Sequence, residues 1–166
     1  MVIRPARDDD APALREIFNE AVQDALATFD TEPVSLDEQR RRLAAAAAEA
    51  RQPILVAELR GWAVGWITIQ QYDLRRHMED VGEVTVFVQR SFRKYGVGRQ
   101  LMQAVQKEAQ RLGYRKLIGH VLAENQDSLR LCRATGWREV GCHLQHALRD
   151  GPPRDVVVVE CLLPGA

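Results

Sequence analysis

Hydrophobic residues recur along the chain in two patterns, and each pattern predicts a different kind of element. Apolar residues spaced three and four apart, as from Leu14 to Ala25, are typical of an amphipathic helix. Short runs rich in valine and isoleucine are typical of strands. The predicted helices span Leu14–Ala25, Ser35–Arg51, Leu101–Leu112 and Asp127–Thr135. The predicted strands span Val2–Arg4, Ile54–Leu59, Ala63–Gln71, Glu83–Val88, Leu117–Leu122, Trp137–Leu148 and Asp155–Leu162.

Capping residues and breakers support these boundaries. Asp8–Asp10 precedes the first helix, and a capping box, Ser35-Leu-Asp-Glu38, precedes an alanine-rich run that Pro53 ends. Gly113 and Gly136 close the two later helices. The expected connections are the turn at Arg60-Gly61, the polar loop Tyr72–Val81, the basic loop Gln89–Tyr95 and the turn at Asp150-Gly-Pro-Pro.

The elements follow the order βααβββαβαββ, which favours an α/β sandwich with helices on both faces of a mixed, mostly antiparallel sheet. No repeat is evident at a period of about 20–50 residues. A length of 166 residues is typical of one domain, so we expect residues 1–166 to form a single domain.

The overall charge argues against polyanionic partners. The chain has 23 Lys and Arg residues against 23 Asp and Glu residues, whereas nucleic-acid and anionic-membrane binders depend on a large positive field. Three cysteines, Cys132, Cys142 and Cys161, without CxxC spacing indicate reduced thiols rather than disulfides or a zinc site. No apolar signal segment or membrane span is evident, so we expect a cytoplasmic protein.

The segment Val84–Arg99 carries the clearest chemistry. A valine-rich strand is followed by Arg93-Lys-Tyr-Gly96-Val-Gly98-Arg99 and then by a helix. Glycines expose successive backbone N–H groups, which bind phosphate at a helix N-terminus, and the basic side chains add charge-assisted donors. No Asp or Glu lies between Val84 and Lys107 to oppose that field, so the segment predicts a pyrophosphate site.

Other phosphate-binding patterns do not fit. The nucleotide motif GxxxxGK[ST] is absent, and Gly96 and Gly98 do not continue as GxGxxG. A glycine-containing loop with basic surface residues and no ligand is the alternative reading of the same residues.

Two segments and the order of elements together resemble the GNAT N-acetyltransferase family. Arg93-x-x-Gly96-x-Gly98 after a valine-rich strand resembles its acetyl-CoA pyrophosphate loop, and Asn125-x-x-Ser128 with the later Gly136-Trp137 resembles a second family segment. The order of elements is also the family's. Thr28-Phe-Asp-Thr-Glu-Pro33, Glu83 and Arg154-Asp-Val resemble the branch that acetylates phosphinothricin and methionine sulfoximine.

The resemblance implies acetyl-CoA as the cofactor. Val86, Phe87 and Val88 would offer backbone groups to the pantetheine arm, as a strand does to an added strand. Asn125 would bind the arm near the thioester and Ser128 would assist, although both residue types also suit a helix N-cap. The loop residues that would hold the pyrophosphate are Arg93, Lys94, Tyr95, Gly96, Val97, Gly98 and Arg99.

Amine acetylation also needs a base, and Glu83 is our candidate, acting directly or through water. An α-amine has a pKa of about 7.7–8, so one weak base suffices. A solvated strand-end carboxylate is the alternative interpretation of Glu83. Where many family members have Tyr or His in the last helix to protonate the leaving thiolate, this chain has Cys132, which we interpret as a small buried hydrophobe.

Substrate selection would fall to Phe29, Glu32, Glu83 and the loop Tyr72–Val81, in which Arg75 could clamp a substrate carboxylate or phosphinate. We expect no metal site. The leading hypothesis is transfer of acetyl from acetyl-CoA to a small amino-acid-like amine. The alternatives are acetylation of a protein N-terminus or lysine, and an acyl-CoA-binding module without turnover. The resemblance also implies a homodimer.

Overall fold

One seven-stranded sheet organises the computed structural model, which describes residues 1–149 and 151–164. The strand order is β1-β2-β3-β4-β5-β7-β6, and all neighbours are antiparallel except β4 and β5. The strands are β1 (Val2–Pro5), β2 (Ile54–Leu59), β3 (Trp62–Gln71), β4 (Val81–Val88), β5 (Lys116–Leu122), β6 (Arg138–Ala147) and β7 (Arg154–Leu162).

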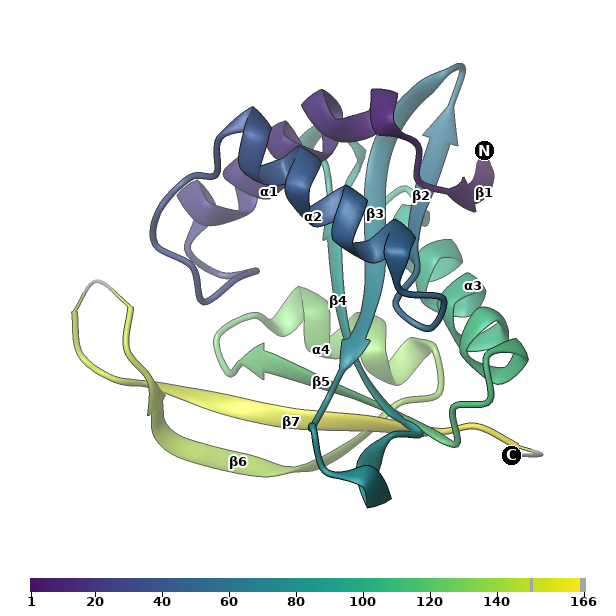
Figure 1. Cartoon of the computed structure of the whole chain (residues 1–166). Helices are drawn as coiled ribbons and strands as arrows, with labels where there is room; N and C mark the ends of the chain where they lie inside the picture. The colour runs from purple at the N-terminus through teal and green to yellow at the C-terminus, as the bar shows by residue number, and fades with distance from the viewer. Residues whose placement is uncertain (150, 165–166) are drawn as a thin grey trace.

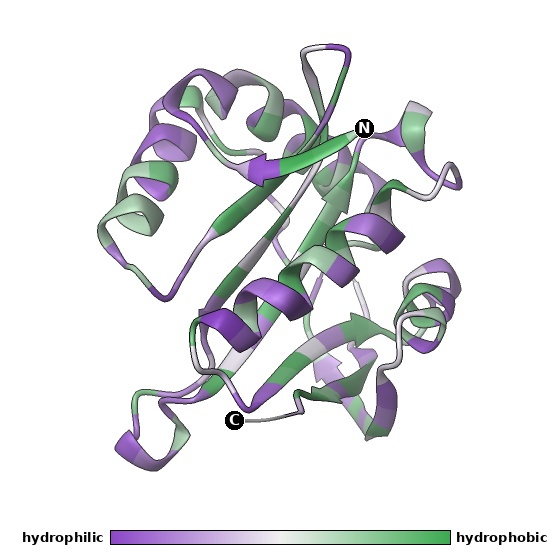
Figure 2. Ribbon diagram, turned by 90° about the vertical axis from the view of Figure 1, so that its right-hand side faces the viewer, coloured by the Kyte–Doolittle hydropathy of each residue, from purple (hydrophilic) through white to green (hydrophobic). Residues whose placement is uncertain are grey.

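Helices cover both faces of this sheet (Figure 1). They are α1 (Ala11–Asp24), α2 (Leu36–Ala48), α3 (Val97–Arg111) and α4 (Gln126–Ala134). Helices α1 and α2 bury apolar residues against Val56, Trp66 and Phe87, whereas α3 and α4 pack on the opposite face. Figure 2 shows the resulting contrast between apolar central strands and polar outer helix surfaces. The predicted α/β class, with helices on both faces of a mixed sheet, is confirmed.

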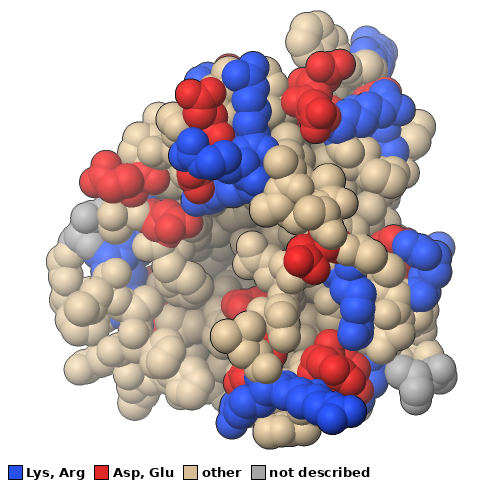
Figure 3. Space-filling view, viewed as in Figure 1, with Lys and Arg blue, Asp and Glu red and all other residues tan. Residues whose placement is uncertain are grey.

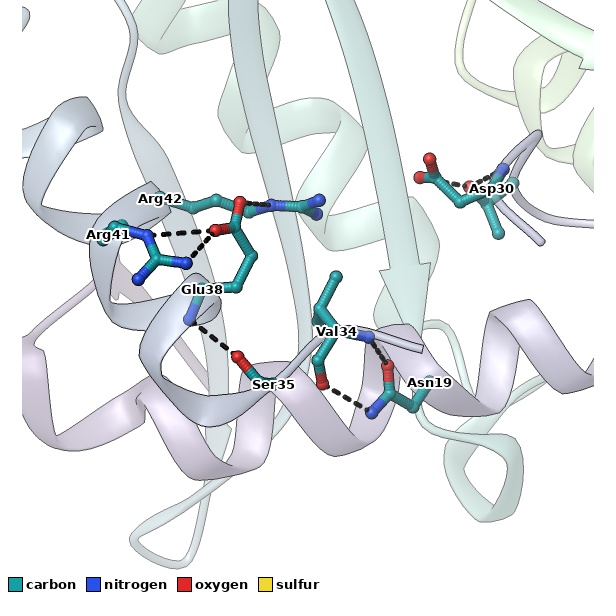
Figure 4. A network of polar contacts seen from close by, with 8 residues as sticks. Asn19, Asp30, Val34, Ser35, Glu38, Arg41 and Arg42 are labelled. Carbon is teal, nitrogen blue, oxygen red and sulfur yellow. Dashed lines mark hydrogen bonds and ion pairs between the residues drawn. The ribbon is translucent and has the colours of Figure 1, made fainter. Parts of the chain in front are cut away.

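The connection between α1 and α2 is held by side-chain hydrogen bonds (Figure 4). The amide of Asn19 donates to the carbonyl of Val34 and accepts from its N–H, at 3.1 and 2.9 Å. Ser35 caps α2 by accepting from the N–H of Glu38 at 3.1 Å, as the capping box predicts. The helix ends at Ala48, short of the predicted Arg51, because Glu49 takes an extended conformation.

The remaining boundaries differ from the predictions by small shifts. Strand β4 begins at Val81, and the polar loop before it contains a 3₁₀ turn at Arg76–Met78. Asp150, the first residue of the predicted turn before β7, lies outside the described residues. Within the described part of the chain, no helix is long and apolar enough to cross a bilayer.

The two parallel strands separate partway along their length. Residues Val81, Gly82 and Glu83 of β4 pair with Lys116, Leu117 and Ile118 of β5, and the pairing ends there. Beyond it β4 stays paired only with β3, and β5 only with β7. The facing edges of the two strands therefore open into a wedge in the middle of the sheet.

Candidate active site

A cleft of about 600 Å³ occupies the wedge between β4 and β5. Its floor and walls are the separated strands, the N-terminal ends of α3 and α4, and the segment after α1. Figure 3 shows the molecule hollowed between the helical half and the β5–β7 half, with charges of both signs around the hollow. Unpaired strand edges of this kind can hydrogen-bond an extended, amide-bearing chain.

The predicted strand residues Val86, Phe87 and Val88 all border this cleft. Their side chains serve the two cores: Val86 and Val88 pack toward α3, whereas Phe87 lies 4.7 Å from Trp66 and 5.3 Å from Phe18 between ring centroids. The side chains thus anchor β4 and leave its backbone edge to the cleft.

The glycine-containing turn lies at the entrance to α3. Gly96 is the N-cap of α3 with a φ of +82°, which favours glycine, and the first N–H groups of a helix have no partner within it. A Cβ at Gly98 would lie 3.0 Å from Leu131, so the turn packs tightly against α4. Arg93, Lys94, Gly96, Gly98 and Arg99 border the cleft, whereas Tyr95 points outward and Val97 is buried in the core.

The expectation that nothing opposes the positive charge of this turn is wrong. Asp24, from the end of α1, lies 2.5 Å from Arg93 and 2.6 Å from Arg90. Burial alone would raise the pKa of Asp24, but hydrogen bonds from the two arginines outweigh it and hold that pKa below its usual value. Lys94 lies 3.9 Å from Asp127 of α4. These acids are distant in sequence, which is why the interval from Val84 to Lys107 concealed them.

Asn125 and Ser128 border the cleft at the start of α4. The side-chain oxygen of Asn125 accepts from the N–H of Ser128 at 3.0 Å, which is an N-cap interaction, and its amide donates to the carbonyl of Leu26 at 2.9 Å. Asn125 therefore caps α4 and ties it to the segment after α1, beside the space that the cofactor arm would use.

Cys132 of α4 also borders the cleft but is 5% exposed. Burial raises the pKa of its thiol to about 11, well above the value of about 8.5 for a free cysteine. Such a thiol is a weaker acid than the thiol of coenzyme A, so it is poorly suited to protonate the leaving thiolate.

Residues 26–29, which follow α1, form one wall of the cleft. Two arginines from the C-terminal part of the chain hydrogen-bond this segment. Arg149, 3% exposed, donates to the carbonyls of Thr28, at 2.9 Å, and of Val22 and Asp30. Arg154 donates to the carbonyl of Ala25 at 2.8 Å. This wall is therefore fixed, and it carries the half-exposed ring of Phe29, a predicted substrate residue.

Glu83 lies where the pairing of β4 and β5 ends, with its side chain 33% exposed. Its Oε1 is 2.7 Å from Nδ1 of His120 on β5, and His120 itself borders the cleft. The sequence interpretation missed His120, because one histidine in the apolar run Leu117–Leu122 resembles a core residue, and only the fold places it beside Glu83.

Arg75 lies outside the cleft lining. It is exposed and binds Asp73, two residues away, at 2.9 Å. The guanidinium that was predicted to clamp a substrate carboxylate therefore binds Asp73 of its own loop.

Among the described residues, no group of three or more His, Cys, Asp or Glu side chains is placed to hold a metal ion.

A second hollow, of about 900 Å³, lies between α1 and the β2–β3 hairpin. Its border includes Asp9, Glu16 and Glu20, together with the exposed ring of Trp62. Carboxylates there would repel a pyrophosphate, and the hollow has no glycine turn at a helix N-terminus. The cleft between β4 and β5 is the better candidate for the site.

The residues of that cleft fit acetyl-CoA. The turn at Gly96 presents free helix N–H groups beside Arg99, and a built Cβ at Gly96 would meet no atom within 4 Å, so there is open space for phosphate. The strand edge from Val84 to Val88 extends from the turn into the cleft, toward Glu83.

A family model for the GNAT acetyltransferase domain matches residues 1–138, and the chain belongs to this family. The class that the fold and cleft define is accordingly an acetyl-CoA-dependent GNAT acetyltransferase, with acetyl-CoA as its cofactor.

Two relatives and two solved structures are most informative. YwnH of Bacillus subtilis strain 168, which carries the provisional name phosphinothricin acetyltransferase, is 31% identical over 160 residues, covering 96% of this chain and 97% of its own. The L-methionine sulfoximine/L-methionine sulfone acetyltransferase of Salmonella typhimurium is 30% identical, covering 82% of this chain and 79% of its own.

The two structures share the fold closely. The ribosomal-protein-alanine N-acetyltransferase of Brucella melitensis has a TM-score of 0.94 at 29% identity, with coverage of 98% of this chain and 100% of its own. The protein yncA of Salmonella typhimurium, solved with its cofactor acetyl-CoA, has a TM-score of 0.94 at 25% identity, with coverage of 100% and 95%.

Proposed function

We propose that this enzyme transfers the acetyl group of acetyl-CoA to the primary amine of a small amino-acid-like substrate of the phosphinothricin, methionine sulfoximine or methionine sulfone type. The names of its relatives support the substrate class. One observation carries the proposal: a single cleft is lined both by a cationic glycine turn and by His120, which pairs with Glu83.

The cofactor-binding residues divide the work along the cleft. Arg93, Lys94 and Arg99 and the N–H groups of residues 95–98 hold the pyrophosphate, and the backbone of residues 86–88 holds the pantetheine arm as an added strand. Asn125 and Ser128 border the arm near the thioester. The bound cofactor supplies an activated acetyl thioester at the Glu83 end of the cleft.

The acceptor end takes the amine. Phe29 offers an apolar surface, and the wall that carries it is fixed by Arg149, so this end suits a small substrate of defined shape. We assign removal of the amine proton to the pair formed by Glu83 and His120. Cys132 stays a protonated, buried thiol, and the coenzyme A thiolate leaves without an acid from the protein.

Release of coenzyme A thiol, measured with a panel of amines, tests this proposal. The panel is phosphinothricin, methionine sulfoximine, methionine sulfone and the common amino acids. We expect turnover with at least one sulfoximine, sulfone or phosphinothricin substrate and product acetylated at nitrogen. Tight acetyl-CoA binding without thiol release from any amine would instead favour the acyl-CoA-binding module.

A second candidate function is acetylation of a protein N-terminus, which the similarity to a ribosomal-protein-alanine acetyltransferase favours. Peptides that begin with alanine, added to the same panel, separate the two. A peptide preferred more than tenfold over every free amino acid in kcat/KM would support this second function and contradict the first.

We further propose that the chain is a single domain, acts in the cytoplasm and forms a homodimer. Cys132, Cys142 and Cys161 are free thiols, as a reducing compartment favours. Strand β6 is an edge strand exposed along nearly its whole length, and with its flanks it presents Val140, Leu144 and Leu148 to solvent. A second copy could cover these residues. Light scattering coupled to size exclusion measures the oligomeric state.

A further inference from the structure

Glu83 and His120 form a side-chain pair beside the cleft. The two side chains meet at 2.7 Å between Oε1 and Nδ1, and both are partly buried, with exposures of 33% and 22%. Within the described residues, no protein group hydrogen-bonds the other ring nitrogen, Nε2. Of the pair, His120 is the residue that borders the cleft.

The fold places this pair at the point where the strands separate. Glu83 is the last residue of β4 paired with β5, opposite Ile118, and His120 follows two residues later on the same face of β5. The imidazole consequently lies at the inner end of the wedge, where the cleft meets the intact sheet. The ring of Tyr72 stacks beside it, with 14° between the ring planes and 6.4 Å between the centroids.

A carboxylate on Nδ1 prepares the imidazole to accept a proton. It holds the N–H on Nδ1, which leaves the lone pair of Nε2 free, and it stabilises the imidazolium that forms when Nε2 takes a proton. As a class, imidazoles are better matched than carboxylates to accepting a proton from an amine near neutral pH. The chemistry and the position both favour the imidazole.

We propose that His120 is the catalytic base of this acetyltransferase and that Glu83 is its positioning residue. This inference rests on the proposed transfer to an amine and assigns its proton. The amine nitrogen forms a bond to the thioester carbonyl carbon as the carbon–sulfur bond breaks. Coenzyme A leaves as the thiolate, and the proton of the amine moves to Nε2 of His120 and from there to solvent.

Four variants test the assignment: His120→Gln, His120→Asn, Glu83→Gln and the double variant His120→Gln with Glu83→Gln. A positioned base contributes about 10²–10⁴-fold, so we expect His120→Gln to lower kcat about 100-fold or more at pH 7. The KM for the amine and the Kd for acetyl-CoA should change less than threefold. His146→Gln, on the exposed strand β6, is the matched control and should leave kcat unchanged.

Two further readouts separate catalysis from structure. Residues that act as a unit are non-additive, so Glu83→Gln should lose less than His120→Gln, and the double variant should lose no more than His120→Gln alone. The kcat/KM of His120→Gln should also rise with pH as free amine accumulates. The groups that face His120 are Glu83 from β4 and Tyr72 from the segment after β3, with Val158 opposite on β7.

The tautomer of His120 gives a readout independent of turnover. In long-range ¹H–¹⁵N spectra of the wild type we expect the proton of the neutral ring on Nδ1, and we expect Glu83→Gln to weaken that preference. If no small amine is acetylated, the substrate proposal fails, and the variants are then assayed with peptides. The tautomer measurement still tests the pairing of His120 with Glu83 in that case. His120→Gln and His120→Asn both within threefold of wild-type kcat, or a proton on Nε2, would overturn the assignment.

Discussion

Removing each of the two arginines of the glycine turn should have a different effect. Arg93 is already engaged: its guanidinium lies 2.5 Å from Asp24 and donates to the carbonyl of Val88 at 3.1 Å, which joins β4 to α1. Arg99 is exposed at the cleft and makes no ion pair with any residue that the structure describes. We therefore predict that Arg99→Ala weakens cofactor binding alone, whereas Arg93→Ala weakens the fold as well as cofactor binding.

The structure sets the sizes of the two effects. A hydrogen bond to a charged group contributes about 1.5–3 kcal/mol, and the exposure of Arg99 favours the lower end, which is about tenfold in the Kd for acetyl-CoA. For Arg93, a partly exposed ion pair of about 1 kcal/mol and a hydrogen bond of about 1 kcal/mol are lost. For a chain of this length, about 2 kcal/mol lowers Tm by about 4–8 °C.

Isothermal titration with acetyl-CoA and thermal unfolding measure both properties on the same samples. Arg111→Ala is the control, because Arg111 lies on the same helix and pairs only with Glu108 within the described residues. An Arg99→Ala variant that binds with wild-type Kd would refute the placement of the pyrophosphate at the start of α3. So would a loss of affinity in Arg111→Ala as large as that in Arg99→Ala.

Three further sets of substitutions test other parts of the structure. Gly96→Ala and Gly113→Ala replace glycines with φ of +82° and +79° and open surroundings, so each should cost about 1–2 kcal/mol in thermal unfolding, but only Gly96→Ala should raise the Kd for acetyl-CoA. Glu160→Gln deprives the partly buried Lys116 of its partner and should cost about 3 kcal/mol at pH 7. The hydrogen bond from Lys116 lowers the pKa of Glu160, so in denaturant titrations this difference should be complete above pH 4.5, the usual value for the unfolded chain, and shrink as pH falls through the lowered pKa. Asn125→Ala and Asn125→Ser both lose the amide bond to Leu26, but only Ser retains the cap, so Asn125→Ala should be less stable by about 1 kcal/mol, and equal Tm values for the two variants would contradict the capping role.

Local patterns predicted most of the fold and the position of the glycine turn at the start of α3. The valine-rich strand, the glycine turn and the following helix are contiguous, so backbone preferences alone place Gly96 and Gly98 at the start of α3. Ser35 caps α2 for the same reason, since the capping box is complete within four residues. The family segments lie in these stretches too, and the family assignment is confirmed.

The acceptor end depends on contacts that no local pattern reveals. His120 meets Glu83 across 37 residues, and only the early end of the β4–β5 pairing exposes the histidine to the cleft. Asp24 reaches the glycine turn from a helix 69 residues earlier. Arg75, in contrast, appeared suitable by its place in a basic loop, but its nearest partner is Asp73, which the loop itself supplies.

The most direct test of the proposed function is product analysis after incubation with acetyl-CoA and a single amine chosen from the panel. We predict equimolar release of coenzyme A thiol and amine acetylated at nitrogen, with the His120→Gln variant forming the same product at least 100-fold more slowly at pH 7. Thiol release that does not depend on the amine, or no acetylated amine or peptide at all from a protein that binds acetyl-CoA, would contradict direct transfer in this cleft.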